Sequence, residues 1–308
     1  GSGKSTLGRC LARLVDPTEG RVIFDGEDIT RARGARLRRF RREVQIVFQN
    51  PASSLNPRRR VGATIGRSLD LLGRVSGTGR QARIGSLLDA VGLPAEFASR
   101  FPHQLSGGER QRVSIARALA SEPRFVICDE PVSALDVSVQ ATVLNLLADL
   151  RDRLRLSYLF ISHDLASVTH IADRIAVMYG GAICEEGPTE ALLAPPFHPY
   201  TQALLSAVPS LDPISEGSPR TRLRGKPGSA GERPRGCRFH GRCPRKIGPI
   251  CETEEPPIVR FREGHWIRCH LPVEALSQAF PSSGTLAKVL GDRASATEEP
   301  VRGDTGRG

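Results

Sequence analysis

Leu-Ser-Gly-Gly-Glu-Arg-Gln-Arg, at residues 105–112, is the stretch from which the fold of this chain can be worked out. Ser106 is followed three residues later by Glu109, a capping box that predicts a helix beginning after Ser106. The two glycines between them leave backbone N–H groups open to a ligand at the positive end of the helix dipole. Alone, the stretch therefore fits either a plain helix cap or a site for an anion such as phosphate.

Length and composition indicate a globular protein with one large domain and an appendage. The 308 residues are 39% hydrophobic and 25% charged, which is ordinary for a globular chain. No apolar run approaches the roughly 20 residues of a membrane span, and there is no signal peptide, so we expect the chain to stay where it is synthesised. The net charge of +11 comes mainly from dispersed arginines, and we therefore expect no nucleic-acid partner.

The first six residues read Gly-Ser-Gly-Lys-Ser-Thr and match the end of a phosphate-binding loop, G-x-x-x-x-G-K-[ST]. In such a loop, backbone amides surround the phosphates, the lysine neutralises them and the hydroxyl after it holds Mg²⁺. The alternative is a flexible terminus without a role. We expect a helix to follow, with Leu7, Leu11 and Leu14 on one face, and to end at Asp16-Pro17.

Polar residues follow three predicted strands. Gln49 follows residues 44–48, Asp129 and Glu130 follow residues 125–128, and His163 follows residues 158–162. Ligands bind at the carboxyl edge of parallel sheets, where these side chains would meet. Because adjacent carboxylates repel each other, a cation at Asp129 and a water at Glu130 would relieve the repulsion. The alternative is that these residues are solvated strand ends with a structural histidine.

The other segments predict an α/β chain with a helical insertion. A strand at 21–24 ends in a turn at Asp25-Gly26, residues 58–104 have helical periodicity, and a helix starts within 133–136. Two closing strands, 174–178 and 182–185, are joined by Gly180-Gly181. Residues 209–234 have the composition of a linker.

In this order, the motifs resemble those of the ATP-binding subunit of an ABC transporter. The matches are Walker A at 1–6, the Q-loop at Gln49, the signature at 105–112, Walker B at 125–130, the D-loop at 133–136 and the H-loop at His163. The resemblance covers residues 1–200. It implies an α/β P-loop NTPase core with a mainly parallel sheet and a helical signature subdomain at about 58–122.

The resemblance also implies how the residues act. Two such domains close head to tail, with ATP between the Walker loop of one and the signature of the other. Glu130 is then the general base that polarises the attacking water, with His163 and Gln49 on the γ-phosphate side. Mg²⁺ would be held by Ser5, Gln49 and Asp129. The residues that would contact a nucleotide are Gly1, Ser2, Gly3, Lys4, Ser5, Thr6, Ser106, Gly107, Gly108 and Asp136. The signature residues among them would face the nucleotide of the partner.

A second resemblance narrows the family. Three features are similar to those of oligopeptide and dipeptide import ATPases. They are the segment His198-Pro199-Tyr200-Thr201, the sequence of residues 130–138 and the cysteine-containing C-terminal part. This implies a subunit at the cytoplasmic face of the membrane that powers di- and oligopeptide import. Its partners would be a second ABC ATPase, two permease subunits and, indirectly, a solute-binding protein. The alternatives are a nickel or glutathione importer, a soluble ABC ATPase acting on nucleic acid or ribosomes, and an inactive structural partner.

Four cysteines crowd the predicted extension at 201–272, before a predicted disordered tail at 273–308. Cys237, Cys243, Cys251 and Cys269 have the spacing C-x5-C-x7-C-x17-C. In a reducing compartment this indicates metal more than disulfides, and the lack of a C-x2-C pair weakens zinc. Nearby arginines would favour thiolates and offset the charge of a [4Fe-4S] cluster, which the family resemblance also suggests. Zinc and free thiols are the alternatives.

The family places an adenine-stacking aromatic residue and further strands before the Walker loop, and this sequence begins after that position. We therefore expect the 308 residues to be a fragment, half of a tandem ATPase or a chain with a misassigned start. We expect such a chain to bind ATP weakly by itself.

Overall fold

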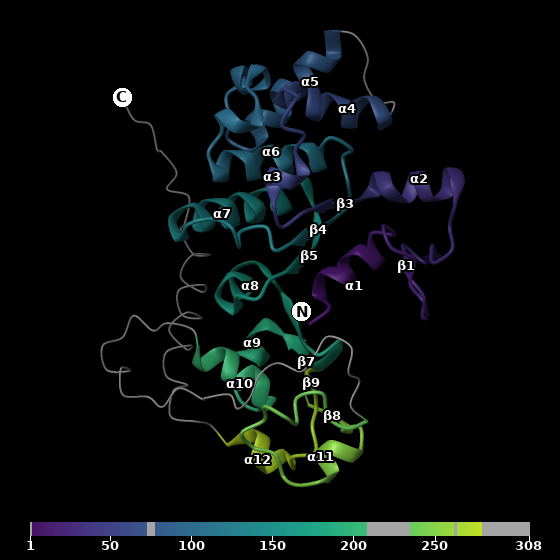
Figure 1. Cartoon of the computed structure of the whole chain (residues 1–308), viewed down its shortest axis with the longest axis vertical. Helices are drawn as coiled ribbons and strands as arrows, with labels where there is room; N and C mark the ends of the chain where they lie inside the picture. Colours follow the sequence, from purple (N-terminus) through teal and green to yellow (C-terminus); the bar gives the residue numbers. More distant parts are fainter. Residues whose placement is uncertain (1, 73–77, 208–234, 262–263, 279–308) are drawn as a thin grey trace, which may run out of the picture. The chain divides into compact units, whose positions relative to one another are not determined.

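The computed structural model describes residues 2–72, 78–207, 235–261 and 264–278 (Figure 1). The chain divides into two compact units, residues 4–171 and residues 172–308 with the first three residues, and each unit has its own sheet. No helix in the described ranges is both long and apolar enough to cross a membrane. The predicted linker at 209–234 lies outside the described residues.

The sheet of the unit at 4–171 is parallel, as predicted. It has the order β3 (Val44–Val47), β4 (Phe125–Asp129) and β5 (Ser157–Ile161). Val44 pairs with Phe125, and Phe125 pairs with Ser157. β4 is buried along most of its length because both faces are covered, which explains its continuous apolar run. The carboxyl ends of all three strands therefore share one edge.

Helix α1 (Lys4–Leu11) packs on β4 and β5 with Gly8 buried and Leu11 partly buried against Ile127 and Ile161 of the core. A Cβ atom on Gly8 would lie 2.8 Å from Ile161 Cδ1, so only glycine permits this close approach. Leu7 and Leu14 are 41% and 47% exposed. The helix also ends at Leu11 instead of Asp16, so its predicted length was wrong, and of the three leucines predicted on one face only Leu11 packs against the core.

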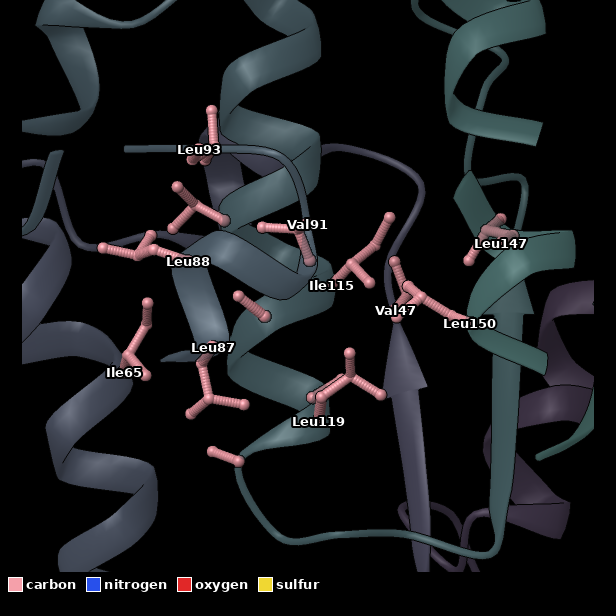
Figure 2. Packing of buried hydrophobic residues seen from close by; sticks show 14 of the residues in the cluster. Val47, Ile65, Leu87, Leu88, Val91, Leu93, Ile115, Leu119, Leu147 and Leu150 are labelled. Atoms are coloured by element: carbon pink, nitrogen blue, oxygen red, sulfur yellow. The ribbon is translucent and has the colours of Figure 1, made fainter. Parts of the chain in front are cut away.

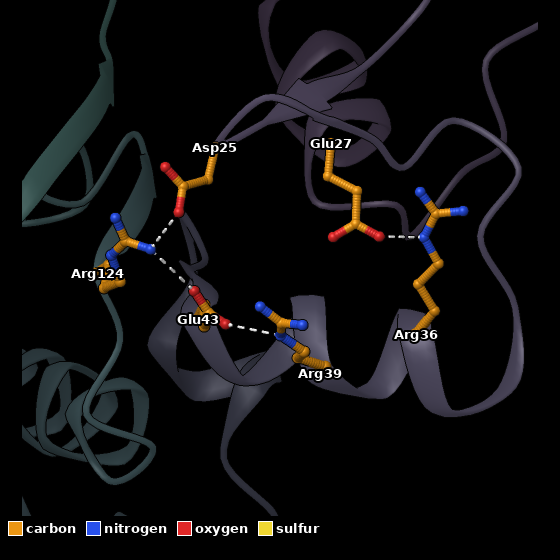
Figure 3. A network of polar contacts seen from close by, with 6 residues as sticks. All are labelled: Asp25, Glu27, Arg36, Arg39, Glu43 and Arg124. Carbon is orange, nitrogen blue, oxygen red and sulfur yellow. Dashed lines mark hydrogen bonds and ion pairs between the residues drawn. The ribbon is translucent and has the colours of Figure 1, made fainter.

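A small hairpin and a basic helix follow α1. β1 (Ile23–Phe24) pairs with β2 (Glu27–Asp28) around Asp25 and Gly26, whose φ angles of 52° and 78° confirm the predicted turn. Helix α2 (Gly34–Glu43) buries Phe40 and exposes its arginines. Arg124, just before β4, reaches Asp25 at 2.8 Å and Glu43 at 3.3 Å, and so joins the hairpin and α2 to the sheet (Figure 3).

The predicted helical insertion contributes most of the core of this unit. The helical subdomain predicted at about 58–122 contains α4 (Val61–Leu72), α5 (Thr78–Ala90), two short 3₁₀ helices (Ala95–Ser99 and Pro102–Gln104) and α6 (Gly107–Leu119), and α3 (Pro51–Ser54) precedes it. Figure 2 shows Ile65 of α4, Leu88 of α5, Ile115 of α6 and Val47 of β3 as members of one buried cluster, with Ile115 beside Val47. The predicted apolar positions Ile84, Leu87, Leu88 and Val91 are all buried there. Helices α7 (Val137–Leu154) and α8 (Leu165–Ile171) complete the unit.

The second unit is built on an antiparallel sheet of order β6-β7-β9-β8. The predicted closing strands are β6 (Arg174–Tyr179) and β7 (Ala182–Pro188), joined at Gly180 and Gly181. The other elements are α9 (Thr189–Leu192), α10 (Pro199–Ser206), α11 (Ile250–Thr253), β8 (Ile258–Arg260), β9 (Trp266–Arg268) and α12 (Val273–Ser277). α12 falls within the segment predicted as a tail, and residues 279–308 lie outside the described residues.

A buried carboxylate connects the parts of this unit. Glu185 of β7 has no exposed surface, and its Oε2 accepts a hydrogen bond of 3.0 Å from the backbone N–H of His198. Its Oε1 lies 2.9 Å from His265 Nε2, just before β9. Because a buried carboxylate is costly without partners, these contacts hold β7, the start of α10 and the β8–β9 segment in one arrangement.

Candidate functional site

The predicted catalytic side chains meet at the carboxyl edge of the parallel sheet. Gln49 follows β3, Glu130 follows β4, and His163 lies two residues beyond β5. Gln49 Nε2 donates a hydrogen bond of 2.7 Å to Glu130 Oε2, and His163 Nδ1 lies 3.4 Å from the same oxygen. Three residues that are distant in sequence therefore converge on one carboxylate oxygen.

The side chain of Glu130 is largely buried, whereas that of the neighbouring His163 is exposed to solvent. The side chain of Glu130 is 15% exposed and that of His163 is 64% exposed. A carboxylate that is held from one side by Gln49 and faces an open imidazole can accept a proton from a water molecule placed beside it. The arrangement is therefore suited to general-base chemistry.

The backbone at Glu130 is unusual and is fixed by its neighbours. Its φ of 49° lies in the left-handed region, which costs a non-glycine residue about 1 kcal/mol or more. The Glu130 N–H donates to the Ile161 carbonyl at 2.9 Å, and the Ser133 hydroxyl donates to the Glu130 carbonyl at 3.1 Å. These contacts aim the carboxylate away from β4. The sequence analysis did not assign this role to Ser133, and its place in the D-loop was the only signal.

Two of the predicted magnesium ligands are in direct contact. Ser5, in the first turn of α1, donates a hydrogen bond of 2.7 Å from its hydroxyl to Asp129 Oδ1 at the end of β4. Asp129 is 1% exposed. A hydroxyl and a buried carboxylate side by side supply the oxygen ligands that Mg²⁺ prefers. Gln49, the third predicted ligand, contacts Glu130 instead.

The signature stretch forms the predicted helix start. Ser106 is the N-cap of α6: its hydroxyl accepts from the Glu109 N–H at 3.2 Å, and the Glu109 carboxylate accepts from the Ser106 N–H at 2.6 Å. The predicted capping box is confirmed. Hydrogen bonding to the Ser106 backbone lowers the pKa of Glu109, so this carboxylate stays ionised near neutral pH.

The glycines of the signature lie against the D-loop and α7. A Cβ atom on Gly108 would lie 2.5 Å from Val139 Cγ1, and one on Gly107 would lie 3.3 Å from Leu135 Cδ2. Asp136 caps α7 by accepting from the Val139 N–H at 3.0 Å, a bond that lowers the pKa of its carboxyl. Gly108 therefore sets how closely α6 approaches the start of α7.

The other predicted nucleotide contacts are only partly described. Lys4 and Thr6 lie in the first turn of α1. Gly1 lies outside the described residues, whereas Ser2 and Gly3 are grouped with the second unit, where the Ser2 carbonyl accepts from the Gly181 N–H at 3.0 Å. Gly3 has a φ of 90°, which explains the need for glycine before α1.

The four cysteines between residues 237 and 269 are close enough for their charges to interact. Burial, together with smaller contributions from neighbouring cysteines, raises the pKa of Cys243 to about 11 and that of Cys269 to about 12. Burial raises the pKa of Cys184 of β7 well above its usual value, and Glu185, Cys237 and Cys269 add to the shift. Among the residues with described positions, no three His, Cys, Asp or Glu side chains are arranged to hold a metal ion.

Two family models match the chain. The model described as "ABC transporter" matches residues 1–133, and "Oligopeptide/dipeptide transporter, C-terminal region" matches residues 184–251. A Brucella abortus protein named as a candidate peptide import ATP-binding protein is 48% identical over 272 residues, which are 88% of this chain and 80% of the relative. The chain belongs to the ATP-binding subunits of the ABC transporter family, in its oligopeptide/dipeptide group.

Other members of the ABC transporter family support this assignment. A candidate peptide ABC transporter ATP-binding protein of Sinorhizobium fredii is 49% identical over 94% of this chain and 82% of its own length. The dimeric ATP-binding cassette MJ0796, solved with ADP and Pi, aligns with a TM-score of 0.56 and 31% identity over 62% of this chain and 82% of that one. CbiO1 from Clostridium perfringens, part of the ABC transporter complex CbiONQ, also aligns with a TM-score of 0.56, at 27% identity over 61% of this chain and 74% of its own. The predicted P-loop NTPase fold is thereby confirmed.

Proposed function

We propose that this ABC transporter subunit hydrolyses ATP and that the hydrolysis powers the import of di- and oligopeptides. The convergence of Gln49 and His163 on the carboxylate of Glu130 is the observation that carries the enzymatic part. The peptide cargo is supported by the names of relatives at 48–49% identity and by the match of residues 184–251 to the oligopeptide/dipeptide C-terminal region.

In the proposed mechanism, the residues position and neutralise charge, as phosphoryl transfer requires. Lys4 neutralises the phosphates, with Gly1, Ser2, Gly3, Ser5 and Thr6 as the remaining contacts of the loop. Glu130 accepts the proton of the attacking water. Gln49 holds the carboxylate in place through the bond at 2.7 Å, and His163 contacts the γ-phosphate side.

Asp129 and Ser5 fit the role of magnesium ligands. Their oxygen atoms lie 2.7 Å apart, one on a carboxylate and one on a hydroxyl, so both can turn to the same cation. We propose that Gln49 contacts the same cation. Bound Mg²⁺ supplies neutralisation of the charge on the phosphate oxygens.

Ser106, Gly107, Gly108 and Asp136 are proposed to serve the nucleotide held by a second ATPase subunit. The capped start of α6 directs backbone N–H groups and the positive end of the helix dipole outward, which suits a phosphate supplied by another chain. The second subunit is either another copy of this chain or a different ABC ATPase, and both ATPases would dock on two permease subunits. A solute-binding protein would deliver the cargo.

The location and the domain boundaries are part of the same proposal. The subunit lies at the cytoplasmic face of the membrane, held there by the permeases. Residues 1–200 form the nucleotide-binding domain, with the helical subdomain at about 58–122, and residues 201–272 form the extension. The match of the C-terminal family model begins at residue 184 and therefore includes most of β7.

Reconstituted transport tests the proposed function. The full chain is combined with the permeases and the solute-binding protein of its transporter, in proteoliposomes that enclose ATP and Mg²⁺ on the side of the ATPase. We expect labelled di- and oligopeptides to cross the bilayer only when ATP is present. Uptake of Ni²⁺ or glutathione in place of peptides would overturn the peptide cargo, and ATP-independent uptake would overturn the energetic role.

Besides ATP and Mg²⁺, the cofactor prediction includes a [4Fe-4S] cluster at Cys237, Cys243, Cys251 and Cys269. The donor set suits iron–sulfur chemistry, but the thiols as placed among the described residues do not make a metal site. No step of the proposed mechanism depends on a cluster. We expect elemental analysis of anaerobically purified protein to find iron and acid-labile sulfide, and a sample without iron or zinc would contradict every metal assignment.

A further inference from the structure

A pocket lies within the unit at 172–308. Its lining includes none of the residues assigned to ATP hydrolysis. It has a volume of about 120 Å³, enough for one small molecule or several waters and less than a drug-sized ligand needs. Its lining includes Tyr179 and Ile183 of the β6–β7 hairpin and residues 235–239, and the ring of Phe239 packs edge-on against that of Tyr179 at 5.0 Å between centroids. The pocket therefore presents apolar and polar surface in similar measure, with the apolar part supplied mainly by Tyr179 and Ile183.

The charged groups that line this pocket are mostly cationic. Arg235, Arg238 and Arg268 contribute three guanidinium groups, and Glu255 contributes the single carboxylate. Glu255 is already paired with Arg268. Arg238 uses one N–H to bind the Gly180 carbonyl at 3.0 Å, which leaves its other donors available. The pocket therefore has an excess of positive charge.

The buried polar groups of the pocket are donors as well. The Nε of Arg268 is buried and has no hydrogen-bond partner among the described residues. His198 is 1% exposed, and burial lowers its pKa to about 3, so its ring is neutral. Because His198 Nδ1 accepts from the Tyr200 N–H at 3.1 Å, the ring proton lies on Nε2, which is a donor. An acceptor-rich ligand would complement these groups.

We infer that this pocket binds a small molecule with an anionic oxygen head group and an apolar body. Guanidinium groups bind carboxylates and phosphates through paired hydrogen bonds, and the surface of Tyr179 and Ile183 receives the apolar part. The inference does not rest on the proposed ATPase mechanism. The unit at 172–308 would thereby bind a ligand of its own.

The single tryptophan of the chain provides a local readout. Trp266 lies two residues before Arg268 in β9, so both side chains lie on the same face of that strand. The full chain is titrated with isovalerate, with its uncharged amide isovaleramide and with inorganic phosphate while Trp266 fluorescence is recorded. The same titrations in Lys4→Ala exclude a signal from the nucleotide site.

We expect a saturable signal with isovalerate, at least about tenfold weaker binding of isovaleramide, and a similar loss in the double variant Arg235→Gln/Arg238→Gln. If phosphate gave a signal and isovalerate gave none, the pocket would bind an anion, but the proposal that it also receives the apolar body of the ligand would be wrong. The control Arg38→Gln/Arg260→Gln removes the same charge from exposed positions outside the pocket and should bind as wild type does.

Three results would overturn the inference. They are no binding of either anion up to about 20 mM, equal binding of the acid and its amide, or unchanged binding in the double variant. Thermal melting followed by circular dichroism shows whether the double variant is folded. If the double variant is not folded, the same titrations are carried out with the single variant Arg235→Gln, which changes an exposed side chain. Unchanged binding in that variant would overturn the inference.

Discussion

Replacing Glu130 by glutamine is expected to lower the rate of ATP hydrolysis by about 10²- to 10⁴-fold, because an amide cannot accept the proton of the attacking water. ATP binding should stay within about twofold of wild type, since the substitution keeps the shape of the side chain and leaves Lys4, Ser5 and Asp129 in place. Steady-state phosphate release and equilibrium binding of a labelled nucleotide, both measured in the assembled transporter, separate the two effects.

The matched control is Glu19→Gln, which makes the same chemical change at an exposed position outside the site. We expect it to hydrolyse ATP at the wild-type rate. Gln49→Ala distinguishes the base from the residue that positions it. It removes the 2.7 Å bond and should lower kcat less than Glu130→Gln does. Hydrolysis by Glu130→Gln at the wild-type rate would contradict the assignment of Glu130 as the base.

The catalytic cluster could be predicted because it depends on local patterns that parallel pairing then brings together. Each apolar strand is short and ends in a polar residue, and in a parallel sheet those ends share an edge. Once β3 and β5 flank β4, Gln49 and His163 lie on either side of Glu130. The capping box at Ser106 was equally predictable, since it depends on only four consecutive residues.

Contacts between distant residues could not be predicted in the same way. The leucines of α1 suggested an apolar face, but Gly8 allows the backbone to approach the sheet, and the sequence does not reveal which side of the helix that is. Likewise, the pairing of Glu185 with His265 joins residues 80 positions apart in sequence. A carboxylate inside an apolar strand signals a buried partner but does not identify it.

Replacing Gly108 by alanine is expected to lower the free energy of unfolding by about 1–3 kcal/mol, because the new methyl group would lie 2.5 Å from Val139 Cγ1. Relief of that overlap moves the start of α6 away from α7. A displacement of about 1 Å at a nucleotide site can reduce activity by about 10²-fold, and we expect a loss of that order in ATP hydrolysis.

The double variant Gly108→Ala/Val139→Ala tests this explanation, because it removes the atom that the new methyl group would meet while Val139 Cβ lies 3.9 Å away. We expect it to regain the stability of Val139→Ala alone and ATP hydrolysis within about threefold of that single variant. Denaturant unfolding and phosphate release measure the two quantities. If stability returned but hydrolysis did not, helix packing would not explain the requirement for glycine. The lack of a side chain at residue 108 would then be needed so that the backbone can approach the nucleotide of the second subunit, which is a different role for the same residue.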